Sequence, residues 1–259
     1  MDIYRDYTTL DVLYDRPCHI QGCGEIYPIK VKDFIDFQKK YNSYFVYTKQ
    51  HLDSFIPDDM CKGSLKKTIT INMARKCQPN EFGRVLSEQD AIMECVMELE
   101  EAFSIVARKE IKYNNGTFSD KDMSVKIDDS NFDYVSKVIV QSNLIYQLKY
   151  YKDPEYARIM EKARKAHNKN PISFEEMICY IKTLNKISYE EIMNENVLQL
   201  NCDFQALAQA ENYRTMMNLK LVSSDKPLNN ARLTCPFVDK LYDNSDNHLI
   251  TSLGDLGIQ

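Results

Sequence analysis

The chain has 259 residues, of which 44% are hydrophobic and 27% are charged, an ordinary composition for a globular protein with a sizeable core. Seven glycines and eight prolines exclude collagen-like and loop-dominated chains, and they favour a helix-rich fold over a sandwich or barrel. The net charge of −5 gives no global indication of nucleic-acid binding. No apolar run approaches the roughly 18 residues of a membrane span. We therefore expect neither a nucleic-acid nor a membrane partner.

Residues 22–34, GCGEIYPIKVKDF, contain two of the seven glycines. A dinucleotide-binding loop has three glycines and lies between a strand and a helix, whereas here Gly22 and Gly24 precede the expected strand and no third glycine follows. Glycines that permit a sharp turn into a strand are therefore the favoured interpretation. We expect a short edge strand over residues 25–31 and then a helix capped by Asp33.

The rest of the N-terminal half predicts one more strand and one long helix. Residues 68–73, TITINM, alternate and are rich in β-branched side chains, so we expect a second strand of a small β element. Ser87 and Asp90 resemble a capping box that starts the helix. Its apolar face should carry residues at helical spacing: Ile92, Val96, Leu99, Phe103 and Val106. The polar segment 114–122 is expected to be a loop and the best domain boundary.

Residues 131–150 have an apolar periodicity that favours a helix, although their β-branched residues leave a strand open. A basic helix is expected to start at Asp153-Pro154 and to stop before Pro171. Residues 149–169 carry seven Lys or Arg against three acids. This charge indicates either a solvated helix face, which is favoured, or a contact with an acidic partner.

Two capping boxes of the same form follow, Ser173 with Glu176 and Ser188 with Glu191, and they imply a short helix, a tight turn and a second helix. A third helix is expected over residues 196–220. Its apolar stripe has steps of three or four: Leu200, Phe204, Leu207, Ala210, Tyr213, Met217 and Leu221.

The expected fold class is therefore mainly α (α+β), a helical bundle with a small N-terminal β element. The expected divisions are an N-terminal α+β region, a polar loop, a helical domain and an irregular C-terminal tail: residues 1–113, 114–122, 123–222 and 223–259.

No segment carries the signature of a catalytic or cofactor site. Cys18, His19 and Cys23 lack a second ligand pair at zinc spacing, so buried free cysteines are favoured over a metal site. Four carboxylates share one face of the helix after Ser87: Asp90, Glu94, Glu98 and Glu101. No Glu-x-x-His accompanies them, which favours a solvated face or a protein contact over a metal. No P-loop or nucleophile elbow occurs. We expect no catalytic residue, cofactor or metal, although an enzyme with an unrecognised site stays open.

Two segments resemble the tail assembly chaperones of long-tailed phages and prophages of Gram-positive bacteria. The first is GCGEIYPIKVKDFIDF, residues 22–37, with a glycine-x-glycine turn, a strand ending Pro-Ile-Lys-Val-Lys and an Asp-Phe helix start. The second is ISYEEIMNENVLQLNCDFQALAQAENYRTMMNLKL, residues 187–221, where a Ser-Tyr-Glu-Glu start precedes a helix with recurring aromatic and Gln/Asn positions. Together they cover less than a quarter of the chain.

The resemblance implies a helical, non-enzymatic protein that coats the apolar tape-measure protein until tail-tube subunits replace it. Its partner would be a tape-measure, tail or baseplate protein, and a homo-oligomer also stays open. The acidic N-terminus lacks the apolar segment of a secretory signal, so we expect reduced cysteines and the host cytoplasm. The alternative is a structural component retained in the virion tail or baseplate.

The last predicted helix is the expected site of the partner contact. Met216 and Leu219 lie beside the apolar stripe that includes Tyr213 and Met217, and they widen the apolar surface beyond one packing seam. A helix too apolar for one packing surface often serves two. The alternative is that these positions belong to the core.

Overall fold

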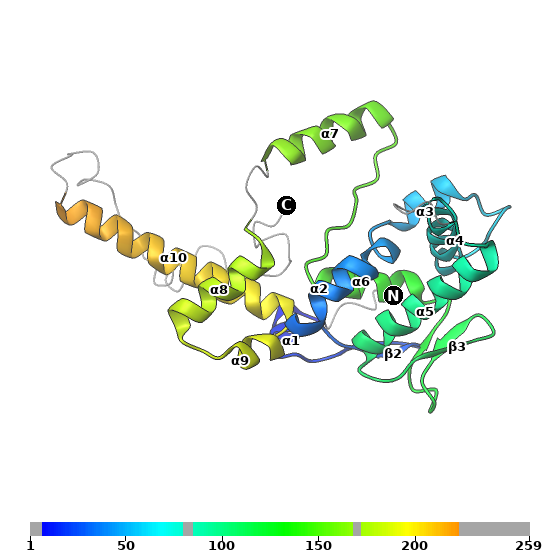
Figure 1. Ribbon diagram of the computed structural model, residues 1–259, viewed down its shortest axis with the longest axis horizontal. Helices are drawn as coiled ribbons and strands as arrows, with labels where there is room; N and C mark the ends of the chain where they lie inside the picture. The colour runs from blue at the N-terminus through cyan, green and yellow to red at the C-terminus, as the bar shows by residue number, and fades with distance from the viewer. Residues whose placement is uncertain (1–6, 80–84, 168–171, 223–259) are drawn as a thin grey trace.

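The computed structural model describes residues 7–79, 85–167 and 172–222, in which α-helices predominate over a two-stranded and a three-stranded sheet. This confirms the mainly α class with a small β element (Figure 1). The helices of the body are α1 (Thr9–Leu13), α2 (Val31–Lys40), η1 (Asn42–Tyr44, a 3-10 helix), α3 (Lys49–Phe55), α4 (Ser64–Lys76), α5 (Glu88–Ala107) and α6 (Phe132–Ser142). Four helices follow: α7 (Pro154–His167), α8 (Phe174–Asn185), α9 (Tyr189–Asn194) and α10 (Val197–Val222). The strands are β1 (Cys18–Ile20), β2 (Gly24–Ile26), β3 (Lys112–Asn114), β4 (Thr117–Ser119) and β5 (Lys126–Ile127).

The glycine-x-glycine segment forms the turn and the start of a β-hairpin. Gly22 and Gly24 have φ values of +77° and +114°, which other residues rarely adopt. Strand β2 pairs antiparallel with β1, with Ile20 opposite Gly24 and Cys18 opposite Ile26. This confirms the turn interpretation. The strand is shorter than the expected 25–31, because the chain enters α2 at Val31.

The strand expected over residues 68–73 is wrong, since these residues lie inside α4. Two of its polar side chains bond back to the helix itself: Thr70 Oγ1 donates to the carbonyl of Lys66 at 2.9 Å, and Asn72 Nδ2 donates to that of Thr68 at 2.9 Å. The hydroxyl of Thr68 is buried without a partner among the described residues. Along its length α4 packs against α5. The low helix propensity of β-branched residues costs only tenths of a kcal/mol each, so this packing decides the conformation.

The loop expected over residues 114–122 is also wrong. Residues 112–119 form the β3–β4 hairpin, and β4 pairs with β5 on its other side. Phe118 of the hairpin is fully buried in the main core, which contains residues from before and after this segment. The segment is therefore part of the packed core and not an exposed linker. The division into an N-terminal region and a helical domain stays a prediction, and the tail expected over 223–259 lies outside the described residues.

Two further helices differ from expectation at their ends. Helix α2 begins at Val31 with Lys30 at its N-cap, so Asp33 lies in the first turn rather than at the cap. The helical alternative for residues 131–150 is confirmed by α6, but α6 ends at Ser142. Asn143 follows it, buried, and its Oδ1 accepts from the backbone N–H of Ile29 at 2.7 Å. This contact ties the end of α6 to the start of α2.

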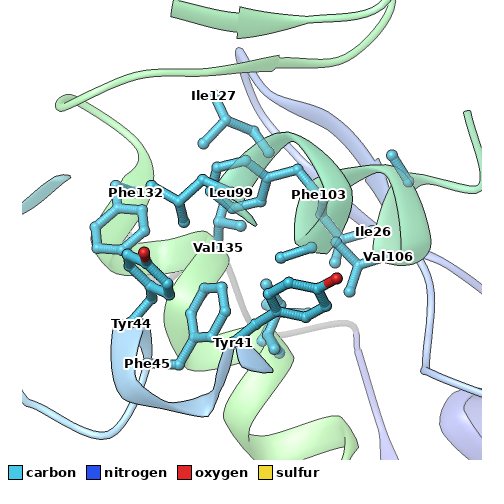
Figure 2. Close-up of a cluster of buried hydrophobic side chains, with 14 of the residues drawn as sticks. Ile26, Tyr41, Tyr44, Phe45, Leu99, Phe103, Val106, Ile127, Phe132 and Val135 are labelled. Carbon is cyan, nitrogen blue, oxygen red and sulfur yellow. The ribbon is translucent and has the colours of Figure 1, made fainter. Parts of the chain in front are cut away.

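Aromatic side chains fill the centre of the main core, which lies between α5, α6 and the hairpins (Figure 2). Phe103 of α5 is the hub, because its ring meets those of Phe118, Phe45 and Phe132 at centroid distances of 5.0, 6.3 and 6.5 Å. Leu99 and Val106 share this buried face, as expected from their spacing. Ile92 does not, since 43% of it is exposed in the first turns of α5.

A second, smaller core joins the C-terminal helices to the body. It consists of Val31, Ile178, Ile181, Ile192 and Leu200. Both expected capping boxes are confirmed at α8 and α9, where Ser173 and Ser188 accept from the backbone N–H groups of Glu176 and Glu191 at 3.1 and 3.2 Å. Helix α10 then projects beyond α8 and α9, and α7 stands apart from the other helices on extended chain (Figure 1).

Candidate protein-binding surface

The root of α10 is fixed to the N-terminal part of the chain by side-chain hydrogen bonds. Asn196 and Gln199 cap the helix reciprocally, with N–H to oxygen distances of 2.7 and 3.0 Å. The amides of the same two residues reach α1 and its C-terminus, donating to the carbonyls of Val12 and Leu13 at 2.6 Å each. This anchor holds the first turns of α10 rigidly and leaves its later turns to project.

The residues expected to contact a partner lie in those later turns. Leu219 is 46% exposed, and Tyr213, Met216 and Met217 are half-buried. The earlier stripe positions differ from them, because Leu200 is buried and its neighbours Phe204 and Leu207 pack on the second core. The stripe is therefore core near the root of α10, while Leu219 is exposed.

A half-buried carboxyl group lies directly at this root. The Oε2 atom of Glu195 is buried without a hydrogen-bond partner among the described residues. The pKa of Glu195 is raised to about 7, first by burial and then by the nearby carboxylates of Asp203 and Glu191, while Lys30 opposes the rise. Burial likewise raises the pKa of Asp203. The root thus holds a carboxyl group that retains its proton near neutral pH.

We expect the Glu195→Gln variant to unfold less readily than the wild type at pH 8. In the folded state the Glu195 carboxyl keeps its proton up to about pH 7, whereas in the unfolded state it loses the proton near its ordinary, lower pKa. The stability of the wild type therefore falls as pH rises from the ordinary pKa of a glutamate to about 7, and it levels off at higher pH. Solvent screening reduces the gain to about 1 kcal/mol. Urea unfolding from pH 4.5 to 8 should show a shallower slope for the variant. Glu190→Gln, on the exposed side of α9, should keep the wild-type slope, and an unchanged slope in Glu195→Gln would contradict the assignment.

The acidic face of α5 is partly occupied by the chain itself. Lys76 of α4 donates to Glu94 and Glu98 at 3.0 and 2.8 Å, and Tyr44 Oη donates to the other oxygen of Glu98 at 2.5 Å. Tyr41 Oη donates to Glu101. Burial, together with hydrogen bonding to Cys95 and Glu98, raises the pKa of Tyr44 well above its ordinary value. Part of the acidic face of α5 therefore contacts other residues of the same chain, rather than lying entirely in solvent.

Two exposed apolar surfaces were missed by the sequence analysis. Met93 and Met97, one turn apart on α5, are 59% and 56% exposed. Tyr156, Ile159 and Met160 of α7 are 50%, 55% and 36% exposed. The spacing of three and four in α7 was the available signal, but it is overshadowed by the lysines and arginines of the same helix.

The cysteine and histidine cluster near the N-terminus is not arranged as a metal site. Cys18 and Cys23 are buried, and burial raises their pKa values to about 11 and about 12, whereas His19 is exposed. Within the described ranges, no group of three or more His, Cys, Asp or Glu side chains is placed to hold a metal ion. The seven cysteines of these ranges are free thiols, and Cys235 lies outside them.

Comparisons of the chain with protein-family models, curated proteins and solved structures found no match. The resemblance to tail assembly chaperones therefore rests on the two quoted segments alone. None of the helices in the described part of the chain is both long and apolar enough to cross a membrane.

Proposed function

We propose that the protein is a non-enzymatic morphogenesis protein of a phage tail, which binds the tape-measure protein or tail subunits during assembly in the host cytoplasm. The observation that carries the proposal is the projection of α10, the helix that contains most of the second resembling segment. Leu219 near its end is exposed, whereas the root is held by the capping residues and the second core. A rigidly rooted helix with apolar side chains toward its end is suited to pack against an amphipathic helix of a partner.

A tape-measure protein is a long helical chain with apolar stripes, and such surfaces aggregate unless a partner covers them. Flexible methionine side chains adapt to partners of varied shape, and α10 carries Met216 and Met217 next to Tyr213. Because binding through such side chains needs no fixed pocket, the partner can later be exchanged for tail-tube subunits.

Retention in the virion tail or baseplate is the second candidate function, and the same projecting helix supports it. The two candidates differ in where the chain is found. Mass spectrometry of purified particles should lack the chain if it is an assembly factor and should contain it at fixed stoichiometry if it is a structural component.

We expect Leu219→Asp to weaken co-purification with the tape-measure protein encoded in the same genome by about tenfold or more, because a carboxylate replaces an apolar contact. The variant should keep its unfolding free energy within about 0.5 kcal/mol, since the side chain is exposed. Asn218→Asp introduces the same charge at the neighbouring exposed position and serves as the matched control.

Loss of the fold in Leu219→Asp would assign the position to the core. An intact fold with unchanged binding would remove the contact from this part of α10.

A further inference from the structure

Helix α7 is an amphipathic helix that packs extensively against none of the other described elements (Figure 1). Tyr156, Ile159 and Met160 form an exposed stripe at spacings of three and four. Lys162, also exposed, borders the stripe beside Ile159. An isolated helix of 14 residues is marginal in water, so this stripe needs a surface to cover it.

A surface with the complementary character lies on α5 of the same chain. Met93 and Met97 are more than half exposed on its outward face, opposite the buried residues Cys95 and Leu99. Residues 88–101 contain six acids and no base. This acidic segment and α7 each span 14 residues, or about 21 Å of helix. The α5 surface is apolar with acidic borders, and the α7 stripe is apolar with the basic Lys162 at its border.

Within one copy, the chain before α7 is held on the far side of α4 from this surface. The backbone N–H of Leu148 donates to the carbonyl of Val46 at 2.9 Å, and the ring of Tyr150 meets that of His51 on α3 at 5.1 Å. Helix α4 packs between α3 and α5. Three residues, 151–153, then separate this anchor from α7, and they reach only about 10 to 14 Å when extended.

We propose that α7 of one copy docks on the outward face of α5 of a second copy, so that the protein self-associates through a basic arm and an acidic apolar surface. Met93 and Met97 pack against Tyr156, Ile159 and Met160, while Lys162, at the edge of the α7 stripe, faces the acids that border the α5 surface. Each copy carries one arm and one surface, so two copies can satisfy both reciprocally. This inference does not depend on the tail partner.

The test is a charge exchange followed by light scattering coupled to gel filtration at low ionic strength. The wild type should have a mass above the 30.3 kDa of one chain, falling toward it as salt screens the contact. Lys162→Glu should weaken association by about tenfold or more. Lys121→Glu, at an exposed position elsewhere, changes the net charge equally and should leave association unchanged.

The reverse variant, Glu94→Lys, should also fail to associate, and Lys76 keeps Glu98 as its partner in it. Mixing the two defective variants should restore association, because the acidic arm of one then meets the basic surface of the other. Ile159→Asp, on the exposed stripe of α7, should lose association without loss of the fold. A wild type of 30.3 kDa at its highest soluble concentration, or a mixture that does not recover, would overturn the proposal.

Discussion

The Gly24→Ala variant is expected to lose about 3 kcal/mol or more of its free energy of unfolding. A Cβ atom at this position would lie 2.3 Å from the backbone oxygen of Ser124, and a backbone atom cannot yield as the end of a flexible side chain does. The φ value of +114° adds backbone strain for any residue with a side chain. The hairpin would have to move away from the β5 segment, where Lys126 N–H donates to the carbonyl of Cys23 at 2.6 Å.

Gly22→Ala is the matched control, because it lies two residues earlier with φ +77° and nothing within 4 Å of the added carbon. It should cost about 1 kcal/mol, the strain of the left-handed backbone alone. Urea unfolding of both variants measures the difference. Equal losses would show that the close approach to Ser124 does not limit position 24.

The glycines also show which parts of the fold could be predicted from the sequence. The absence of a third glycine was enough to favour a turn over a dinucleotide loop, because that decision depends on local chemistry. The need for glycine at position 24 could not be foreseen, because it arises from residues 100 positions away in the chain. Local capping patterns such as Ser173 with Glu176 were likewise predictable, since all their atoms lie within one helical turn.

At residues 68–73, by contrast, the local sequence pattern led to a wrong prediction. Alternation and β-branching favoured a strand, yet the segment had no strand partner in space, and packing of α4 on α5 gave it more burial as a helix. The hairpin at 112–119 was missed because Asn115-Gly116, a typical turn pair, was interpreted as part of a polar loop. A search for alternating residues on both sides of that pair would have found it.

The candidate site was predictable only in part. The apolar spacing along the last helix predicted its stripe, and Leu219 was identified as an apolar residue beside it. The spacing did not show that the stripe is buried only near the root, because periodicity gives a face and not the length over which neighbours cover it. The anchoring of the root by Asn196 and Gln199 depends on α1, far away in sequence. The α5 surface was not predicted, because Met93 and Met97 are interspersed with the six acids of residues 88–101, which indicated a polar face.

The Phe103→Ala variant should lose about 3 to 5 kcal/mol of its free energy of unfolding, the cost of a large cavity in a well-packed core. Phe103 is fully buried and its ring touches three other aromatic rings, so little of the space can close by rearrangement (Figure 2). Met93→Ala on the same helix is the control. Because Met93 is 59% exposed and alanine has the higher helix propensity, its stability should change by less than about 0.5 kcal/mol.

The comparison also separates stability from association on one helix. If the outward face of α5 receives α7 of a second copy, Met93→Ala should weaken self-association while leaving the isolated fold intact. Phe103→Ala should lower the stability of the fold but leave self-association unchanged at temperatures where the variant remains folded, since Phe103 lies on the inward face with Leu99 and Val106. Thermal unfolding and light scattering on the same samples distinguish the two effects. Destabilisation by Met93→Ala comparable to that of Phe103→Ala would place Met93 in the core and remove the apolar surface on which docking of α7 depends.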